Sequence, residues 1–374
     1  METFLSKTQA QKLIKQYGSP LLVLKRSKMA ESFHTLDELL PRVQLFYAVK
    51  SNPHPEIIKT FARLGSSFEV ASLAEIEMLI KKKVSPQRII FANTVKKIQD
   101  LKAARKFKID LSTFDSENEL EKIAEHLPRS KVLLRLKVPN IDSMVDLSVK
   151  FGAPPEDAVK LLSSAKRKGL VPYGVSFHVG CQCLNPVNYG KALELTAEVF
   201  SACKKINMPL SMLDIGGGFP IQYLPGSKVP TIQDIARKIN NSLDKLFPDK
   251  RIKIIAEPGR FLCGPCANLI TSVIGHNVRN GKRWYALDDG LYGTFSGILF
   301  DHGKYNFISY DTGKMFASVL AGPSCDSLDI IAEDLYLPKL GIGDMLVTPA
   351  IGAYSSAHAT RFNGIPLTKS IVIA

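Results

Sequence analysis

Short apolar segments alternate with longer amphipathic ones over residues 26–262. The apolar segments, such as Leu45–Val49 and Val132–Leu136, are continuous in hydrophobicity, whereas the segments between them show helical periodicity. Strands that alternate with helices pair in parallel through right-handed crossovers, and about eight such units close a barrel. We therefore predict an α/β fold whose core is a (β/α)8 barrel spanning residues 26–262.

The pattern changes at residue 263 to short β-prone segments that glycine and proline separate. The predicted strands are 269–274, 284–287, 304–308, 318–320, 345–348 and 370–373. This pattern predicts a mainly antiparallel C-terminal β-domain over residues 263–374. Residues 1–25 contain one predicted helix and one predicted strand, and we expect them to pack on that β-domain.

The net charge of +14 raises the question of a nucleic-acid partner. The lysine clusters, such as 81–83 and 96–97, are short and scattered, and no aromatic residues are interleaved with them. A basic surface that attracts anionic small molecules or a phosphorylated cofactor explains the charge equally well. The sequence contains neither an apolar run long enough to span a membrane nor a secretory signal pattern. We therefore expect no nucleic-acid or membrane partner, and a cytoplasmic location.

The cysteines are sparse and show no disulfide-framework spacing, so we expect reduced thiols. Cys263 and Cys266 copy the spacing of a dithiol redox motif, but they lie at the predicted domain boundary with β-structure after them. A redox dithiol instead lies at a helix N-terminus in a small βαβ domain. Cys181 and Cys183 have no second pair at zinc-ligand spacing, so no metal site is expected.

Lys50 lies at the end of the predicted strand Leu45–Val49, and the following Ser-Asn-Pro ends that strand. Loops at the carboxyl ends of barrel strands carry the chemistry of such folds. A lysine that is partly desolvated there can have a lowered pKa and can bind a carbonyl cofactor covalently. The simpler alternative for a single lysine is an ordinary surface residue in a loop.

Three further motifs follow predicted barrel strands. The glycines 216–218 would let backbone N–H groups approach a phosphate, although a plain tight turn would also use them. Glu257 could keep a ring nitrogen protonated and Arg260 could bind a phosphate, or the two could simply pair with each other. His178 could stack on a cofactor ring, or it could be a hydrogen-bonded core residue.

The C-terminal part places polar side chains in predicted loops. Asp301, Cys325, Asp326 and Tyr354 each lie in a segment rich in glycine or serine. Taken one at a time, solvated loop residues are the simpler explanation for all of them.

Six motifs occur in one order along the chain. They are Phe-Tyr-Ala-Val-Lys-Ser-Asn from residue 46, Phe-His-Val-Gly from 177, Asp-Ile-Gly-Gly-Gly from 214, Glu-Pro-Gly-Arg from 257, Cys-Asp-Ser-Leu-Asp from 325 and Gly-Ala-Tyr from 352. Taken together and in this order, they closely resemble the ornithine decarboxylase family. That family consists of group IV decarboxylases, which depend on pyridoxal 5'-phosphate (PLP) and have the alanine-racemase-like barrel fold. The resemblance covers residues from about 20 to 364.

The resemblance implies that PLP is the cofactor and that Lys50 binds it covalently. It implies that Glu257 pairs with the pyridine nitrogen, that His178 stacks on the ring and that Arg135 lies near the ring oxygen and the lysine. The remaining cofactor-binding residues, mainly at the phosphate, would be Gly216, Gly217, Gly218, Gly259, Arg260 and Tyr354.

The resemblance also implies a head-to-tail homodimer with two shared active sites. Cys325 and Asp326 would enter the partner subunit's site, with Cys325 as the proton donor to Cα. Asp301, Asp326 and Phe300 would contact the substrate. Two carboxylates suit a distal ammonium, whereas diaminopimelate, with its distal carboxylate, would need cationic recognition. The expected reaction is therefore L-ornithine to putrescine in polyamine biosynthesis, with L-lysine to cadaverine as the second reaction.

Three positions depart from the family pattern. Glu69 replaces a common aspartate, Cys181 replaces a serine and so weakens one phosphate contact, and Phe300 replaces a tyrosine. The alternatives are a diaminopimelate or arginine decarboxylase on the same fold, an amino-acid racemase, and an inactive regulatory homologue. The retained Lys50, Arg260 and Cys325 argue against the inactive homologue. Racemases of this fold place a tyrosine base opposite the lysine, whereas this chain offers Cys325 in an acidic loop.

Overall fold

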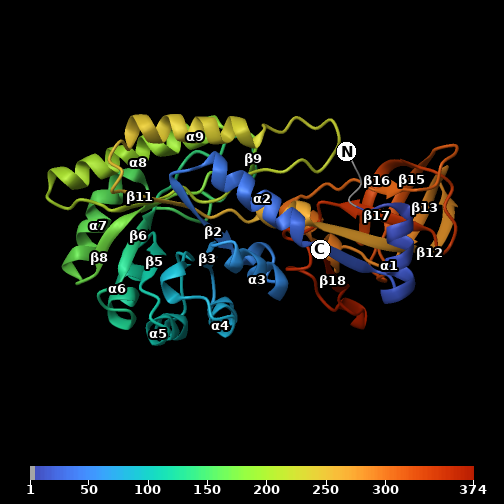
Figure 1. Ribbon diagram of the computed structural model, residues 1–374, viewed down its shortest axis with the longest axis horizontal. Helices are drawn as coiled ribbons and strands as arrows, with labels where there is room; N and C mark the ends of the chain where they lie inside the picture. The colour runs from blue at the N-terminus through green and yellow to red at the C-terminus, as the bar shows by residue number, and fades with distance from the viewer. Residues whose placement is uncertain (1–4) are drawn as a thin grey trace. The chain divides into compact units, whose positions relative to one another are not determined.

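The computed structural model describes residues 5–374 and contains two compact units (Figure 1). The barrel unit comprises Ala30–Pro220 and Val229–Phe261. The β unit comprises the residues up to Met29, Ile221–Lys228 and Leu262–Ala374. The domain limits expected from the sequence, 26–262 and 263–374, stay a prediction.

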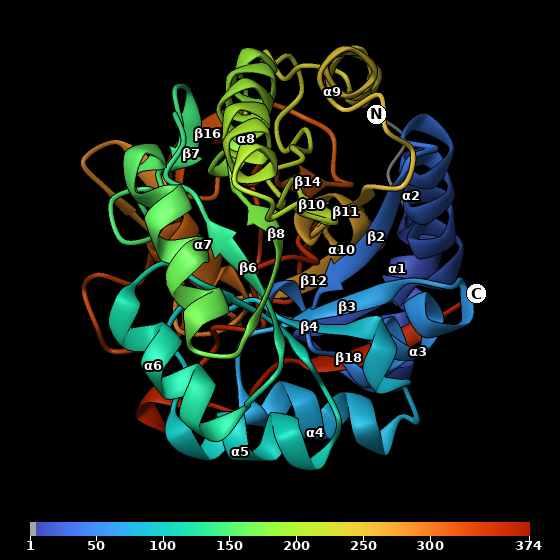
Figure 2. The same ribbon diagram turned by 90° about the vertical axis from the view of Figure 1, so that its left-hand side faces the viewer.

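The barrel unit contains a closed barrel of parallel strands with helices around it (Figure 2). The strands are, in order around the barrel, β10 (Met212–Asp214), β11 (Lys253–Ala256), β2 (Val43–Ala48), β3 (Ser67–Val70), β4 (Ile89–Phe91), β5 (Leu111–Phe114), β6 (Lys131–Arg135) and β8 (Val171–Ser176). The helices are α2 (Arg26–Leu39), α3 (Pro55–Arg63), α4 (Leu73–Lys81), α5 (Ile98–Lys106), α6 (Glu117–His126), α7 (Ala158–Arg167), α8 (Val187–Lys205) and α9 (Ile232–Leu246). A short antiparallel pair, β7 (Ser143–Val145) with β9 (Cys181–Cys183), and the turn of helix α10 (Arg260–Cys263) complete the elements around it.

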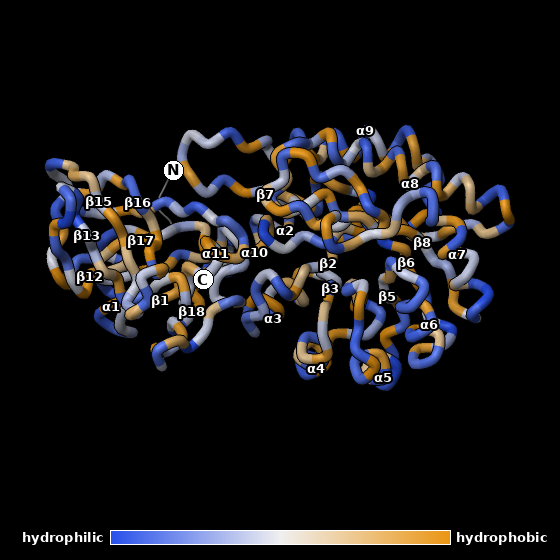
Figure 3. The backbone as a smooth tube through the Cα atoms, turned by 180° about the vertical axis from the view of Figure 1, so that it is seen from behind, coloured by the Kyte–Doolittle hydropathy of each residue, from blue (hydrophilic) through white to orange (hydrophobic). Residues whose placement is uncertain are grey.

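Burial explains why the barrel closes. Its strands are almost continuously buried, and five apolar residues from five strands form one cluster inside it: Phe46, Ile90, Leu133, Met212 and Ile255. The outer helices instead alternate apolar and polar residues, as the colour changes along α8 and α9 show in Figure 3. Apolar surface on both faces of the strands is thereby removed from water, which is the main stabilising contribution to such a fold.

Several helices begin at side-chain caps directly after a strand or loop. The hydroxyl oxygens of Ser72, Ser116 and Thr231 accept hydrogen bonds from backbone N–H groups in the first turns of α4, α6 and α9. Such caps satisfy N–H groups that lack a partner within the helix. They fix where each helix starts, and the connections from β3 to α4 and from β5 to α6 are short.

The β unit is built on a mixed sheet. Its elements are α1 (Lys7–Tyr17), β1 (Leu21–Lys25), β12 (Ala267–Arg279), β13 (Lys282–Leu287), α11 (Gly297–Asp301), β14 (Ile308–Ser309), β15 (Phe316–Ala321), β16 (Ile330–Leu337), β17 (Met345–Pro349) and β18 (Lys369–Ile373). Strand β1 pairs antiparallel with β12 and parallel with β18, and β13 pairs parallel with β15. The other pairings, including β12 with β17, are antiparallel. Leu5, Leu21, Ile270 and Val347 lie in one buried cluster, which ties the N-terminal segment into this unit.

The predicted fold class is confirmed, with local differences. The strand expected at 304–308 is the short β14, Ile308–Ser309. Strand β16 was not predicted, because its burial shows no regular alternation and Asp334 within it has a positive φ of 58°. In the described part of the chain, no helix combines the length and the hydrophobicity that crossing a membrane requires.

The barrel packing generates a prediction at Gly174 in β8. A Cβ at this position would lie 1.9 Å from the carbonyl oxygen of Met212 in β10, so the strands would have to move apart. Gly174→Ala should lower the free energy of unfolding by about 3 kcal/mol, the upper end for overpacked sites. Urea denaturation measures it.

Gly169→Ala is the matched control. Gly169 has a φ of +76° but open space around its Cβ position, so only backbone strain of about 1 kcal/mol is expected there. An equal or larger loss for Gly169→Ala would contradict the packing argument.

Candidate active site

The carboxyl ends of the barrel strands bring together the barrel residues singled out from the sequence. Lys50 follows β2, Arg135 ends β6, and His178 follows β8. The glycines 216–218 follow β10, and the segment from Glu257 to Arg260 follows β11. Parallel strands of a barrel all end at the same rim, so residues far apart in the sequence share one site there.

Lys50 lies in a single 3-10 turn, Val49–Ser51, and its Nζ donates a hydrogen bond to the carboxylate of Glu69 in β3. The side chain of Lys50 is 43% exposed, whereas that of Glu69 is 2% exposed. Burial alone would lower the pKa of the Lys50 amine, but the negative charges of Glu69 and Glu257 and the hydrogen bond outweigh it and raise the pKa. The lowered pKa expected from the sequence is therefore wrong for the chain alone, because carboxylates surround the amine.

The turn that carries Lys50 is held by neighbouring polar groups. The hydroxyl of Ser51 donates to the carbonyl oxygen of Ala48 at 2.7 Å, and the hydroxyl of Tyr47 donates to the carbonyl oxygen of Asn52 at 2.9 Å. Both hydroxyls are buried, so these bonds are shielded from competing water. They fix the backbone from which the amine projects.

Glu257 and Asp214 form a buried acidic pair. Burial, followed by the charges of Asp214 and Glu69, raises the pKa of Glu257 well above its ordinary value. Burial raises the pKa of Asp214 to about 7, although its Oδ1 accepts a hydrogen bond from Gly216 N at 2.9 Å. Within the described residues, the buried Oε1 of Glu257 has no hydrogen-bond partner. A protonated ring nitrogen is the kind of donor that this acceptor would suit.

His178 and Arg135 are held in fixed orientations near this pair. The Nδ1 of His178 accepts a hydrogen bond from Gly180 N at 3.1 Å, which fixes the ring. Burial, then the positive charges of Arg135 and Lys50, lowers the pKa of His178 well below its ordinary value, so the imidazole is neutral. The guanidinium of Arg135 lies 4.8 Å from the centre of the Phe151 ring, and burial lowers the pKa of Arg135.

The three glycines after β10 cannot be replaced without moving their neighbours. Gly216 and Gly218 have φ angles of +65° and +98°, which L-residues with a Cβ rarely adopt. A Cβ on Gly216 would lie 2.2 Å from the carbonyl oxygen of Phe177, and one on Gly217 would lie 3.0 Å from Nε2 of His178. The turn thus exposes backbone next to the His178 ring, as a phosphate-binding turn must.

Gly259 and Arg260 complete this side of the rim. A Cβ on Gly259 would lie 2.8 Å from Cβ of Ser51, so this turn passes directly against the turn that carries Lys50. The guanidinium of Arg260 is buried, with the residue 4% exposed, and its Nη2 donates to Sγ of Cys181 at 3.2 Å. An amine, a buried acceptor, a flat neutral ring, a glycine turn and a buried arginine together fit a phosphorylated pyridine aldehyde.

Five residues expected in the site belong to the β unit. Asp301 is buried in the last turn of α11, while Phe300 beside it is 62% exposed. Tyr354 has a positive φ of 52°. Cys325 and Asp326 lie in the exposed segment between β15 and β16, and Cys325 is a free thiol.

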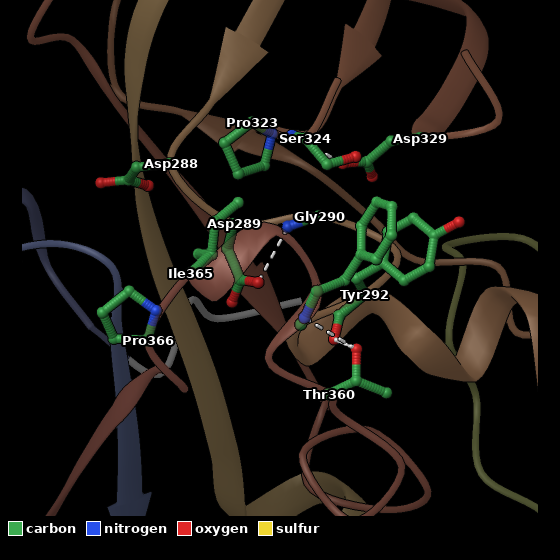
Figure 4. A pocket seen from close by; sticks show the side chains of 12 residues that line it. Asp288, Asp289, Gly290, Tyr292, Pro323, Ser324, Asp329, Thr360, Ile365 and Pro366 are labelled. Atoms are coloured by element: carbon green, nitrogen blue, oxygen red, sulfur yellow. Dashed lines mark hydrogen bonds between the residues drawn. The ribbon is translucent and has the colours of Figure 1, made fainter. Parts of the chain in front are cut away.

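Asp329 fixes the segment that carries Cys325 and Asp326. Its Oδ1 accepts a hydrogen bond from Leu291 N at 2.7 Å, and its Oδ2 accepts one from Ser324 N at 3.1 Å. The Tyr292 hydroxyl donates to the carboxylate of Asp326, and hydrogen bonds lower the pKa of that carboxyl. Figure 4 shows Asp329 and Ser324 on one side of a small hollow and Asp289, bonded to Gly290, on another. Buried carboxylates thus hold the turns around an ionised Asp326.

Besides Glu69, two acidic residues of the barrel site were not assigned a role from the sequence. Asp214 belongs to the quoted Asp-Ile-Gly-Gly-Gly motif, so its position was available, but its contact with Glu257 depends on the neighbouring strands β10 and β11. Glu75 lies in α4, where its Oε2 accepts a hydrogen bond from Ala71 N. A single acidic residue in a predicted helix does not indicate that its side chain lies near an active site.

The remaining cysteine motif lies in the β unit. Cys263 and Cys266 are reduced thiols and fully buried, and Sγ of Cys266 donates to the carbonyl oxygen of Cys263 at 2.9 Å. Burial, followed by the neighbouring Cys263, raises the pKa of Cys266 well above its ordinary value. A buried thiol with a raised pKa is a poor nucleophile.

The carboxylate cluster generates a prediction at Glu75. Burial, followed by the charge of Glu69, raises the pKa of Glu75 from 4.5 to about 7, so the folded chain holds a proton that the unfolded chain releases. The stabilisation from this group is complete below about pH 4.5 and is lost as the pH rises through about 7. In the apoprotein, the free energy of unfolding should therefore fall less between pH 4.5 and about 7 when Glu75 is replaced by glutamine (Glu75→Gln). The difference should be at most about 3 kcal/mol.

Glu77→Gln, at an exposed position of the same helix, serves as the control and should leave the decline in place. Denaturant unfolding across this pH range gives the measurement. A Glu75→Gln profile that parallels the unmodified chain would contradict the prediction.

Comparison with known proteins identifies the family. The family model for the pyridoxal-binding domain of pyridoxal-dependent decarboxylases matches residues 26–264. The lysine/ornithine decarboxylase of Selenomonas ruminantium is 41% identical over 368 residues, which cover 98% of this chain and 93% of that protein. The structure of the Vibrio vulnificus lysine/ornithine decarboxylase complexed with putrescine is 36% identical, with a TM-score of 0.91 over 99% of each chain. Antizyme inhibitor 2 of Xenopus laevis is 38% identical over 342 residues, covering 87% of this chain and 74% of that protein.

These similarities confirm the fold, the cofactor and the enzyme class that the sequence motifs imply. The family match spans the barrel strands whose carboxyl ends carry Lys50, His178, Glu257 and Arg260. This chain belongs to the group IV PLP-dependent decarboxylases, the ornithine decarboxylase family.

Proposed function

We propose that this enzyme decarboxylates a basic amino acid, with L-ornithine as the main substrate and L-lysine as the second. The reaction releases CO2 and leaves a diamine, putrescine or cadaverine. The buried carboxyl group of Glu257, close to Lys50 and with one oxygen without a partner in the described residues, is the observation that carries the proposal. It provides an acceptor for a ring N–H at the place where a PLP enzyme needs one.

The barrel residues have separate proposed roles toward the cofactor. Lys50 Nζ would link it covalently to the chain and would yield this position to the substrate's α-amine. His178 would stack on the ring, and Arg135 would hold the ring oxygen. The phosphate would be held by Gly216, Gly217, Gly218, Gly259 and Arg260, and Tyr354 stays the further phosphate contact that the family resemblance implies.

PLP supplies an electron sink for the pair of electrons left on Cα when CO2 departs. With PLP bound, Glu257 would ionise, accept a hydrogen bond from the ring nitrogen and keep that nitrogen protonated, because a positive partner favours the charged carboxylate. The neutral His178 would add no positive charge against the ring face. Cys325 Sγ would supply the proton for Cα, and the Lys50 amine would hold the cofactor again after product release.

The charge of the β unit supports a substrate with a distal ammonium. Asp326 is held ionised by hydrogen bonds from Leu328 N and the Tyr292 hydroxyl, and Asp301 supplies a second acidic group. The two named lysine/ornithine decarboxylases support the same substrate class. Phe300, which is 62% exposed, would give an apolar wall for the methylene chain.

We also propose a head-to-tail homodimer in which Cys325 and Asp326 serve the partner's site. The hydrogen bonds that Asp329 makes to Ser324 N and Leu291 N hold an exposed loop in one conformation, which suits a segment that enters another subunit. The six free cysteines suit a reducing compartment, so a cytoplasmic location and a place in polyamine synthesis are part of the proposal.

The similarity to antizyme inhibitor 2 keeps a regulatory role as the second candidate. Lys50 with its partner Glu69, the glycine turn and Arg260 are arranged here as a cofactor site, which favours the enzyme. A regulatory protein without activity would have no use for an amine surrounded by carboxylates.

Side-by-side kinetics test the substrate proposal. L-ornithine should give the highest kcat/KM, L-lysine a value lower by a factor of about 10 to 200 because one methylene is worth 1–3 kcal/mol, and arginine and diaminopimelate should react far more slowly. Diaminopimelate or arginine as the best substrate would contradict the proposal. No turnover of any of the four by PLP-loaded protein would favour the regulatory role.

Mixed dimers test the shared site. Lys50→Ala and Cys325→Ala chains should each be nearly inactive, and their mixture should regain up to about a quarter of the activity, since random pairing leaves one intact site in half of the dimers. Mixing Lys50→Ala with Lys50→Arg chains is the control and should restore nothing. If the mixture of Lys50→Ala and Cys325→Ala chains regains no more activity than the control mixture, the site is not built from two chains.

A further inference from the structure

Cys181 lies against the proposed phosphate site. It follows Gly180 at the start of β9, and Cys183 N in the same strand donates to the carbonyl oxygen of Gly218 at 2.9 Å. A Cβ on Gly218 would lie 2.6 Å from the carbonyl oxygen of Gly180, so the two segments are in direct contact. The backbone segment that carries Cys181 therefore packs directly against the glycine turn.

The Cys181 thiol also contacts the buried arginine of that site. Nη2 of Arg260 lies 3.2 Å from Sγ of Cys181. Both groups come from strand ends at the same rim, although they are far apart in the sequence. A guanidinium beside a sulfur favours the negatively charged thiolate, which is the nucleophilic form. The arginine that would bind a phosphate therefore also contacts the thiol, at the edge of the proposed phosphate site.

Exposure separates Cys181 from the other cysteines of the described barrel unit. Cys183 and Cys203 are buried, whereas Cys181 is partly exposed. Cys325 is exposed, but it lies in the β unit. Of the cysteines in the described barrel unit, Cys181 is therefore the one that a small reagent entering the cofactor site would meet.

We propose that Cys181 is a modification site that controls cofactor loading. The inference rests on the proposed function, because it takes the glycine turn and Arg260 to be the phosphate site. An adduct on Sγ would fill the space of the phosphate and would block the contact between Arg260 and the phosphate. The modified apoprotein would therefore bind PLP poorly. Bound PLP would in turn cover the thiol, so the loaded enzyme would resist modification.

The covalent step can be written for two classes of reagent. With iodoacetamide, Sγ forms a bond to carbon, the carbon–iodine bond breaks, iodide leaves and the thiol proton goes to solvent. With a low-molecular-weight disulfide such as glutathione disulfide, Sγ forms a new S–S bond, the reagent's S–S bond breaks and one glutathione leaves as its thiol. The second adduct is removed by excess dithiothreitol, so loading would respond reversibly to the thiol–disulfide balance.

The test treats the apoprotein and the PLP-loaded protein with iodoacetamide or glutathione disulfide. Peptide mass spectrometry then locates the adducts, and fluorescence titration measures PLP affinity after excess reagent is removed. We expect Cys181 to be labelled in the apoprotein and protected by PLP. We expect PLP affinity to fall at least tenfold after labelling and to recover with dithiothreitol only after the glutathione treatment.

Two variants make the test specific. Cys181→Ser keeps a hydrogen-bonding group but not the nucleophile, so its PLP affinity should be the same before and after treatment. Cys325→Ser removes the other accessible thiol and should still lose PLP affinity when treated. Loss of affinity in treated Cys181→Ser would overturn the proposal, because another site would then be responsible.

Failure of the inference and failure of the function are distinguishable. If untreated protein binds PLP and decarboxylates substrate, but labelling at Cys181 leaves PLP affinity unchanged or PLP gives no protection, the inference is wrong and the function stands. If untreated wild-type and Cys181→Ser proteins both fail to bind PLP, both are wrong.

Discussion

The ion pair between Lys50 and Glu69 is the interaction on which the barrel site depends. Several carboxyl groups gather below the rim, and each would be costly to bury as an isolated charge. Two cations, Lys50 and Arg135, offset part of this cost, and the remainder shows as the raised pKa values of Asp214, Glu257 and Glu75. Without a cofactor, these carboxyl groups thus favour their protonated forms at the place where a cationic ring nitrogen would bind. A positive partner there would favour loss of the protons.

Backbone geometry sets the second constraint. The glycine turn after β10 passes so close to Phe177, His178 and Glu257 that side chains are excluded from it. The same closeness positions the His178 ring, whose Nδ1 is held by Gly180 N. The groups proposed for charge recognition and for ring stacking therefore both come from the ends of neighbouring strands. Such fixed placement is what an enzyme that works by orienting a cofactor requires.

The barrel and the position of its site could be predicted from local pattern. Alternating strands and helices imply parallel closure, and closure puts Lys50, His178 and Glu257 at one rim. The charge state could not be predicted in this way. The raised pKa of Lys50 arises from distances between β2, β3 and β11 that no local pattern encodes. The contact between Arg260 and Cys181 was hidden for the same reason, although the cysteine itself stood out from the family pattern.

Reduction with borohydride, followed by peptide mapping, tests the central claim most directly. Borohydride fixes the link between a lysine amine and an aldehyde cofactor, so the modified residue can be read from peptide masses. Protein loaded with PLP should carry the pyridoxyl group on Lys50, and a Lys50→Ala chain should carry none at the barrel rim. A pyridoxyl group fixed at another lysine of the unmodified protein, with Lys50 unlabelled, would contradict the account.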